Sequence, residues 1–520
     1  MAQTFEDITK EVVNRFLQNI LFIDDKAYLS ENKANDFDAC KISTVFAKEG
    51  KLCTVFAPSS ENDISNCYSL YLKSDIVVLD WYLALTNENY EKDDEKDADM
   101  DEPRGFYTKS LIKEIVVDAK KDKLKLILVY TGETNLENIT EEIYNEIKQY
   151  GDFEQDYCYV HSSNIVILIR AKYNGEAQFK HHENLKKMIV KYEELPSFIS
   201  SEFAKLVNGL LPIFVLSAIS VIRENTSKLL NAYSSELDIA YLGHKIVLPN
   251  PNESKDLLIK IFGESVIDLI SSINIDTQNW LSLWIAAEYP NPNVIKISER
   301  KSITVDKNIL ERIITGNENF DELIKTLFEN LSKNDRNYIH NNAALLLSTD
   351  SNLIKKSNID FAKLTHHKNI FSPRVDCPFL TLGTVVRSID DNNYYLCIQQ
   401  KCDSLRIDGI RRFLFLPLVE DAGNFHIVVN KDIQLKIAKS SFDVKTIKFR
   451  ADDEKRYVSS ECIIDDKTKM KKFIFSSIYD EKYEWVLELK DMHAQRVVNS
   501  YCSILSRVGL DESEWLRLLS

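Results

Sequence analysis

The run Asn19-Ile20-Leu21-Phe22-Ile23-Asp24-Asp25 decides the fold of the N-terminal part of this chain. It has the pattern of a short apolar strand that ends in two adjacent carboxylates. Residues 75–79 have the same pattern and end at Asp80. Residues 124–130 also have it and end at the hydroxyl of Thr131. In an open parallel sheet the residues just past the strand ends share one edge, where sites are built. Carboxylates and a hydroxyl at that edge suit Mg²⁺ and a phosphoryl group.

The periodicity of apolar residues divides the chain into three predicted domains. Residues 1–172 alternate strands and helices, and their apolar, β-branched strands predict a doubly wound parallel sheet of five strands with helices on both faces. Residues 173–370 have long helical patterns, whereas residues 371–520 have short β-rich runs and a closing helix near 492–507. We therefore expect a multidomain protein of α/β, α-helical and β-rich parts.

Composition limits the functional classes. The 520 residues carry a formal net charge of −15, which argues against a general nucleic-acid binder, because phosphate contacts need clustered Lys and Arg. The nine cysteines are scattered singly, which favours reduced thiols and a cytoplasmic protein over a disulfide framework. The first residues lack a basic region followed by an apolar one, so we expect no signal peptide.

One segment resembles a membrane span in composition. Residues 206–222 are strongly apolar and lie between Lys205 and Arg223. The segment is slightly short for a span, and polar residues and Pro212 interrupt it. We expect a buried helix of the helical domain and no membrane association.

The N-terminal region resembles the receiver domain of bacterial response regulators. The resemblance rests on acids after the first and third strands, a hydroxyl after the fourth and a basic residue near the end of the fifth: Asp24, Asp25, Asp80, Thr131 and Lys172, with Arg170 as the alternative to Lys172. It implies a flavodoxin-like fold. It also implies that Asp80 accepts a phosphoryl group from a histidine kinase or a phosphotransfer protein.

The resemblance implies a role for each of these residues. Asp24, Asp25 and Asp80 would hold Mg²⁺ together with the backbone carbonyl of Tyr82. Thr131 would bond one phosphoryl oxygen, and Lys172 would pair with another. Carboxylates packed this closely repel one another, so a cation is needed to keep them all ionised.

Two departures from the receiver pattern leave alternatives open. The region is long and includes an acidic loop, residues 91–104, whose Asp97-x-Asp99-x-Asp101 spacing is similar to a calcium loop but lacks its central Gly and terminal Glu. A solvated loop is the simpler interpretation. The fifth strand lacks the usual Lys-Pro pair and has Ile169 where an aromatic residue is expected. A pseudo-receiver scaffold that takes no phosphate is therefore an alternative.

The rest of the chain is similar to large receiver proteins of bacterial phage-defence and conflict loci. The similarity lies in six segments: residues 203–212, 222–225, 395–399, 402–406, 413–418 and 493–496. In one such system, Detocs, a kinase-like sensor passes phosphate to two receiver proteins. One of them carries a nucleotide-degrading effector, and the other acts as a phosphate sink. Because this chain has no effector motif, it resembles the phosphate sink more, and a second receiver or effector protein is a further partner.

The last predicted domain allows a competing function. Residues 371–450 carry 12 Lys or Arg against 9 Asp or Glu, and Arg411 and Arg412 precede Phe413. A receiver-gated effector acting on nucleic acid or nucleotides is therefore the second hypothesis, although a salt-bridged β surface also explains the pattern. There is no Walker A, dinucleotide or zinc motif, so beyond self-phosphotransfer and autodephosphorylation we expect no enzyme activity. The adjacent pair His366 and His367 is expected at the surface, and the sequence does not fix the oligomeric state.

Overall fold

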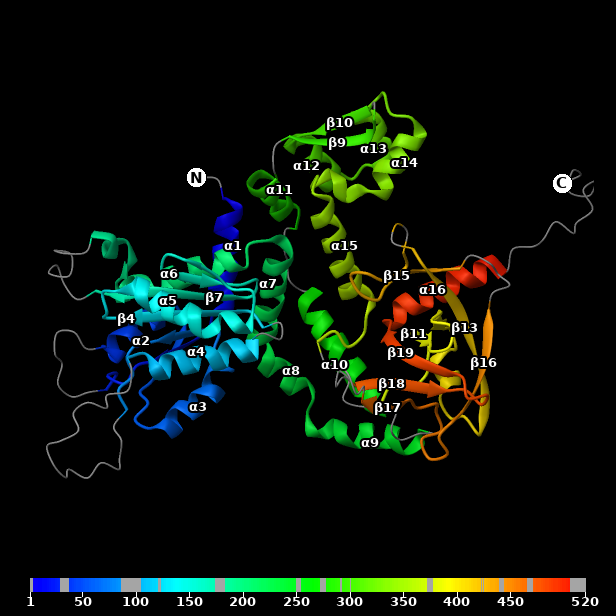
Figure 1. Ribbon diagram of the computed structural model, residues 1–520, viewed down its shortest axis with the longest axis horizontal. Coiled ribbons are helices and arrows are strands. Elements are labelled where there is room, and N and C mark those ends of the chain that lie inside the picture. The colour runs from blue at the N-terminus through cyan, green and yellow to red at the C-terminus, as the bar shows by residue number, and fades with distance from the viewer. Residues whose placement is uncertain are drawn as a thin grey trace, which may run out of the picture. The chain divides into compact units, whose positions relative to one another are not determined.

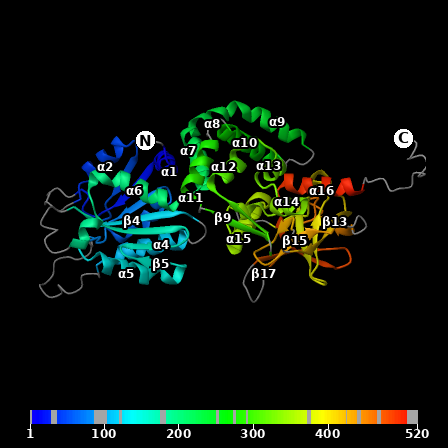
Figure 2. The ribbon, with the colours of Figure 1, turned by 90° about the horizontal axis from the view of Figure 1, so that it is seen from above.

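The structure is a computed structural model of the 520-residue chain. It describes residues 3–28, 37–85, 104–119, 123–173, 183–248, 254–271, 277–289, 292–299, 301–371, 377–421, 423, 425–438, 444–464 and 471–505. The chain forms two compact units, drawn in Figure 1 and Figure 2. The first comprises residues 1–290 and 307–317, and the second comprises residues 291–306 and 318–520. This division is not a test of the three predicted domains, which stay a prediction.

The first unit is built on a mixed sheet of eight strands in the order β2-β1-β3-β4-β7-β6-β5, with β8 paired to β7. Five strands are parallel: β1 (Asn19–Ile23), β2 (Leu52–Phe56), β3 (Ile76–Leu79), β4 (Lys125–Thr131) and β7 (Ile165–Lys172). Three short strands extend them: β5 (Glu154–Asp156), β6 (Tyr159–His161) and β8 (Ile189–Val190). The alternating strands and helices are confirmed. The prediction of a five-stranded sheet was incomplete, because the chain before β7 folds back as an antiparallel hairpin and β8 adds a parallel edge.

Helices cover both faces of this sheet (Figure 1). One core includes α3 (Glu61–Tyr71), α4 (Phe106–Ala119) and α5 (Leu136–Ile147). The opposite core includes α1 (Phe5–Phe16), α2 (Ala39–Lys48), α6 (Leu195–Leu206) and α7 (Leu210–Glu224). The apolar, β-branched strands require this double cover, since their side chains are buried on both faces.

The apolar segment of residues 206–222 forms most of α7. Ile213, Leu216 and Val221 are buried, so this helix packs into the core of the first unit. Helix α7 ends before Asn225, after which α8 (Thr226–Ala232), α9 (Asp238–Val247), α10 (Ser254–Ser271), α11 (Thr277–Glu288) and α12 (Lys307–Thr315) follow. Within the described residues, no single helix has the length and apolar character of a membrane span, although α7 with residues 226–247 passes that test as a bent pair.

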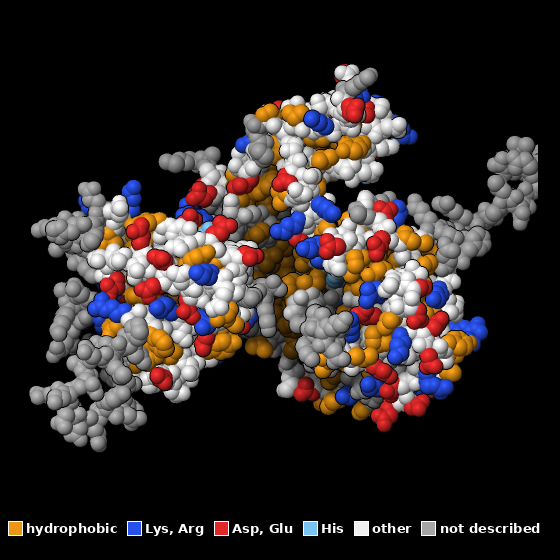
Figure 3. Space-filling view, viewed as in Figure 1, with side chains coloured by type: hydrophobic (Ala, Val, Ile, Leu, Met, Phe, Trp, Pro, Cys, Tyr) orange, Lys and Arg blue, Asp and Glu red, His pale blue; other side chains and the backbone are white. Residues whose placement is uncertain are grey.

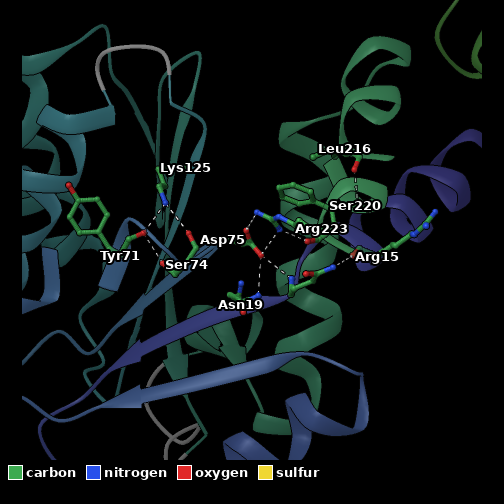
Figure 4. A network of polar contacts seen from close by, with 11 residues as sticks. Arg15, Asn19, Tyr71, Ser74, Asp75, Lys125, Leu216, Ser220 and Arg223 are labelled. Atoms are coloured by element: carbon green, nitrogen blue, oxygen red, sulfur yellow. Dashed lines mark hydrogen bonds and ion pairs between the residues drawn. The ribbon is translucent and has the colours of Figure 1, made fainter. Parts of the chain in front are cut away.

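A partly buried ion pair attaches α7 to the edge of the sheet where β3 begins (Figure 4). Arg223 donates to both carboxylate oxygens of Asp75, at 3.1 Å and 2.8 Å, and its guanidinium lies over the ring of Phe16. The same carboxylate accepts the backbone N–H groups of Gln18 and Asn19, just before and at the start of β1. Asp75 therefore joins three segments, and all of its partners are charged or backbone donors.

Removal of this guanidinium should destabilise the first unit. Arg223→Met keeps most of the side-chain volume but leaves the Asp75 carboxylate, which is only 5% exposed, without its counter-ion. We expect the free energy of unfolding in urea to fall by about 2–4 kcal/mol. Arg15→Met is the matched control. Arg15 of α1 pairs with Glu224 of α7 at an exposed position, so this substitution should lower the free energy of unfolding by only about 0–1 kcal/mol. Equal losses in the two variants would contradict this assignment.

The second unit combines a helical part with an antiparallel sheet. The helical part contains the hairpin β9 (Asn293–Ser298) and β10 (Lys301–Val305), which the helical prediction for 173–370 missed, with α13 (Phe320–Leu327), α14 (Lys333–Asn341) and α15 (Ser351–His366). The sheet has nine strands in the order β14-β15-β13-β12-β11-β19-β18-β17, with β16 paired to β13. Its strands are β11 (Thr384–Ser388), β12 (Tyr394–Cys397), β13 (Ile410–Glu420), β14 (Ile427–Val428), β15 (Gln434–Ile437), β16 (Lys445–Arg450), β17 (Glu461–Ile464), β18 (Lys471–Ser476) and β19 (Lys482–Glu488), and α16 (Asp491–Leu505) closes the chain.

The β-rich character and the closing helix are therefore confirmed, but the expected surface position of the adjacent histidines was wrong. His366 and His367 are half-buried, and the His366 ring stacks on the buried His493 at a centroid distance of 3.6 Å. The cause is that α15 ends against the start of α16, which His493 belongs to. The calcium-like spacing at residues 97–101 lies outside the described residues.

Candidate functional site

The strand register brings the predicted site residues to one edge of the sheet. Ile23 of β1 is level with Leu79 of β3, which is level with Val129 of β4, and that residue is level with Ile169 of β7. Strands β1 and β3 end at this level, whereas β4 and β7 run on to Thr131 and Lys172, so these residues lie at the same edge as Asp24 and Asp80. This is the carboxyl edge of the parallel strands, where ligands bind in open α/β sheets.

Lys172 lies between two of the three carboxylates. Its Nζ donates to Asp24 Oδ2 at 2.6 Å and to Asp80 Oδ1 at 2.8 Å, and all three side chains are at least 90% buried. The rings of Phe37 and Tyr130 lie beside the ammonium, at 5.3 Å and 6.0 Å from Nζ to the centroids. A buried ammonium with two carboxylates is a strong, charge-assisted contact.

Arg170, the alternative to Lys172, is used elsewhere. Its Nη1 donates to the backbone carbonyls of Cys158 and Ile169, and its guanidinium lies over the ring of Phe198. There it lines a surface cavity of about 670 Å³ together with Lys187. Of the two basic residues, the structure thus places Lys172 against the carboxylates.

The protonation states of Asp80 and Lys172 follow from their burial and from the attraction between their charges. Burial raises the pKa of Asp80, and the nearby Lys172 charge opposes that change. Burial likewise disfavours the Lys172 ammonium, but the carboxylates of Asp80 and Asp24 outweigh it and raise the pKa of the lysine. Lys172 therefore stays charged, and its charge holds the two acids together.

Asp25 is the carboxylate that this lysine does not neutralise. Its Oδ1 is buried and has no hydrogen-bond partner, while a backbone hydrogen bond from Ala84 reaches the same carboxylate. Burial, and then repulsion from Asp24, raise the pKa of Asp25 to about 6. The site thus holds three acids but one buried lysine, and the third acid is poorly compensated.

Two predicted residues lie at this edge without a contact that defines their role. Thr131 ends β4, is buried, and its hydroxyl accepts the backbone N–H of Glu133 at 3.1 Å. The backbone N–H of Tyr82 donates to Asp80 Oδ2 at 3.3 Å. The roles of the Thr131 hydroxyl and of the Tyr82 carbonyl stay predictions.

The sequence interpretation missed three residues of the site. Thr108 of α4 donates its hydroxyl to the backbone carbonyl of Asp80 at 2.7 Å and so fixes the turn after β3. Phe37 and Tyr192 pack on each other at 6.1 Å, and the Tyr192 ring also packs on Tyr130 at 6.1 Å. The Tyr192 hydroxyl accepts the backbone N–H of Asp38 at 3.4 Å. These aromatic residues come from loops, where no periodicity in the sequence marks them.

The donor set fits a hard divalent cation. Mg²⁺ prefers carboxylate, carbonyl and water oxygens, and Asp24, Asp25 and Asp80 supply carboxylates, one with an unpartnered buried oxygen. Within the described part of the chain, no three His, Cys, Asp or Glu side chains are grouped as a ready-made metal site. Lys172 holds Asp24 and Asp80 in its own hydrogen bonds.

Comparison with known families agrees with this geometry. The family described as the response receiver domain matches residues 16–177. These residues form a response receiver domain. The match spans β1 to β7 and therefore includes every site residue predicted from the sequence, whereas Tyr192, α6, α7 and the second unit lie beyond it. Receiver domains generally bind Mg²⁺ at the phosphorylation site and interact with a phosphodonor such as a histidine kinase or phosphotransfer protein. No match to a curated protein was found for the chain.

Asp25 should make the receiver domain sensitive to pH and to Mg²⁺. Its folded-state pKa of about 6 lies above the ordinary value of 3.8, so the folded protein holds this proton more tightly than the unfolded chain. The proton on Asp25 therefore contributes to the free energy of unfolding; this contribution is fully present below pH 3.8 and is lost as pH rises through about 6. Without metal, Asp25→Asn should therefore melt at a higher temperature than the wild type at pH 7.5, with a smaller difference at pH 5.

Thermal melting with EDTA and with Mg²⁺ tests this prediction. Mg²⁺ should raise the melting temperature of the wild type at pH 7.5, and raise it less at pH 5 and in Asp25→Asn. Glu133→Gln, at a half-buried acid after β4 that pairs with Arg104, is the control and should behave as the wild type. A lower melting temperature of Asp25→Asn at pH 7.5 without metal would show that the Asp25 charge is well compensated.

Proposed function

We propose that the receiver domain is a response-regulator-like phosphoacceptor and that Asp80 takes the phosphoryl group. The observation that carries this proposal is the contact of the buried Lys172 ammonium with both Asp24 and Asp80, next to the uncompensated carboxylate of Asp25. A chance cluster of solvated acids would be exposed and would need no buried lysine. A scaffold without phosphotransfer would have no reason to keep two buried acids and a half-buried third together at a cost in stability.

The residues have distinct tasks in the proposed transfer. A carboxylate oxygen of Asp80 attacks phosphorus, and the bond from phosphorus to the donor histidine nitrogen breaks, with the electron pair leaving on that nitrogen. The imidazole takes up one proton from water as it leaves, and the product is an acyl phosphate on Asp80 and a neutral imidazole on the partner. The Lys172 ammonium lies 2.8 Å from Asp80 Oδ1, close to where the phosphoryl oxygens arrive, and would pair with one of them.

Magnesium would be held by Asp24, Asp25, Asp80 and the Tyr82 carbonyl, and when bound it neutralises charge on the transferred phosphoryl oxygens. The Thr131 hydroxyl would bond another of these oxygens. Thr108 would position the nucleophile, because its hydroxyl fixes the backbone carbonyl of Asp80. Tyr192 and Phe37, which with Tyr130 surround the lysine, would exclude water from the buried salt bridge.

The proposed phosphodonor is a histidine kinase or a phosphotransfer protein of a bacterial two-component pathway. The similarity of the remaining chain to large receiver proteins of phage-defence loci supports antiviral defence as the setting. It also supports the role of a phosphate sink, as in Detocs-like systems, because no effector motif is present in the sequence. A receiver that only stores phosphate needs the acceptor site described above and no catalytic site of its own.

Intact mass measurement tests the acceptor directly. After incubation with acetyl phosphate and Mg²⁺, the wild type and Glu133→Gln should gain the mass of one phosphoryl group, whereas Asp80→Asn should gain none. A kinase-dependent receiver can fail with acetyl phosphate, so thermal melting with beryllofluoride and Mg²⁺ forms the second arm. The absence of both a mass adduct and a beryllofluoride shift would overturn the proposal and leave a docking module.

A further inference from the structure

Helix α9 carries an apolar stripe that faces away from the rest of its unit. Ile239, Leu242, Ile246 and Val247 are 81%, 53%, 80% and 76% exposed, and the helix has no buried residue. The spacing of these residues places them on one face of the helix. On the visible surface in Figure 3, hydrophobic and charged side chains are interspersed, as expected of a protein surface. A continuous stripe of large aliphatic residues is different and marks an interaction site.

The opposite side of α9 is the side that packs within the unit. There the Tyr241 hydroxyl bonds Ser254 of α10 at 3.1 Å. Gly243 lies next to Leu242, and a Cβ added at this glycine would meet no atom within 4 Å. The fold of the unit therefore does not require glycine here, although glycine in a helix costs about 1 kcal/mol relative to alanine. A glycine beside an apolar stripe allows a second helix to approach closely.

The charges of α9 identify the occupant of this stripe. Asp238 and Lys245 are seven residues apart, about two helical turns, so they lie on the same flank of the stripe. When two copies of α9 pack antiparallel about a two-fold axis, this flank of one copy lies against the same flank of the other copy, which runs in the opposite direction. Asp238 of each copy then meets Lys245 of the other. Ile239 meets Ile246, and Leu242 packs against Gly243 near the axis.

We propose that α9 is the contact surface of a homodimer, in which two copies of this helix pack antiparallel. The stripe is self-complementary in both shape and charge, as an isologous interface requires. A pair of 10-residue helices is smaller than a standard interface of about 1,600 Å², so the dimer should dissociate on micromolar dilution. This proposal does not depend on phosphotransfer at Asp80.

Sedimentation velocity of the full chain over a micromolar concentration series tests the dimer. The wild type should shift from monomer to dimer with increasing concentration. Asp238→Lys and Lys245→Asp should each weaken dimerisation by about tenfold or more, because like charges then face each other twice. An equimolar mixture of the two variants should recover dimers, since the introduced lysine of one chain faces the introduced aspartate of the other.

Lys260→Asp is the matched control. It reverses a similar exposed lysine on α10, which pairs with Glu264 rather than with the α9 flank, and it should dimerise as the wild type does. Circular dichroism of each variant separates unfolding from loss of the contact. A wild type that stays monomeric at all concentrations would overturn the proposed dimer. Binding of this monomer to phosphatidylcholine vesicles through the stripe would also overturn it, because the stripe would then contact lipid. Single variants that dimerise normally, or a mixture that recovers nothing, would overturn the antiparallel arrangement.

Discussion

The contact of Lys172 with Asp24 and Asp80 is the interaction on which the receiver site depends. Two carboxylates buried at the end of apolar strands would repel each other and lose hydration, and either effect alone would be costly. One ammonium at 2.6 Å and 2.8 Å from them offsets both effects. The arrangement requires β7 to be level with β1 and β3, so the parallel register of the whole sheet is a condition of the site.

The same contact leaves the charge of Asp25 poorly compensated. Lys172 supplies a single positive charge to three acids, and the acid left over, Asp25, has an unpartnered buried oxygen and a pKa raised to about 6 by burial and by Asp24. Proton binding at acidic pH and Mg²⁺ binding at neutral pH are two ways to compensate that charge. In the proposed transfer, the phosphoryl group would add negative charge to the site, which would favour both Mg²⁺ and the lysine.

Sequence patterns predicted the parts of this protein that depend on local periodicity. The five parallel strands, their helices and the acids after β1 and β3 follow from apolar runs that end in polar residues. Lys172 was the preferred basic residue, and its contacts now separate it from Arg170. Strand β5 was missed because its three residues are too few to show a period, and the hairpin β9–β10, whose strands do alternate, was overlooked between long helical patterns. Phe37, Tyr192 and the stacked His366 are set by tertiary contacts between distant segments, which no local pattern encodes.

Strand β3 lies between the Asp75–Arg223 ion pair and the candidate site at Asp80. It has only four residues, with Asp75 just before it and Asp80 just after it. Asp75 holds Arg223 at the end of α7 and the backbone at the start of β1, whereas Asp80 is held by Lys172 of β7 and by Thr108 of α4. Because this strand is short and fully buried, a displacement of Asp80 along it would also move Asp75 and the end of α7. Helix α7 ends before Asn225, and the chain continues through α8 toward α9. The ion pair of Arg223 thus ties the end of α7 to the same short strand that leads to Asp80.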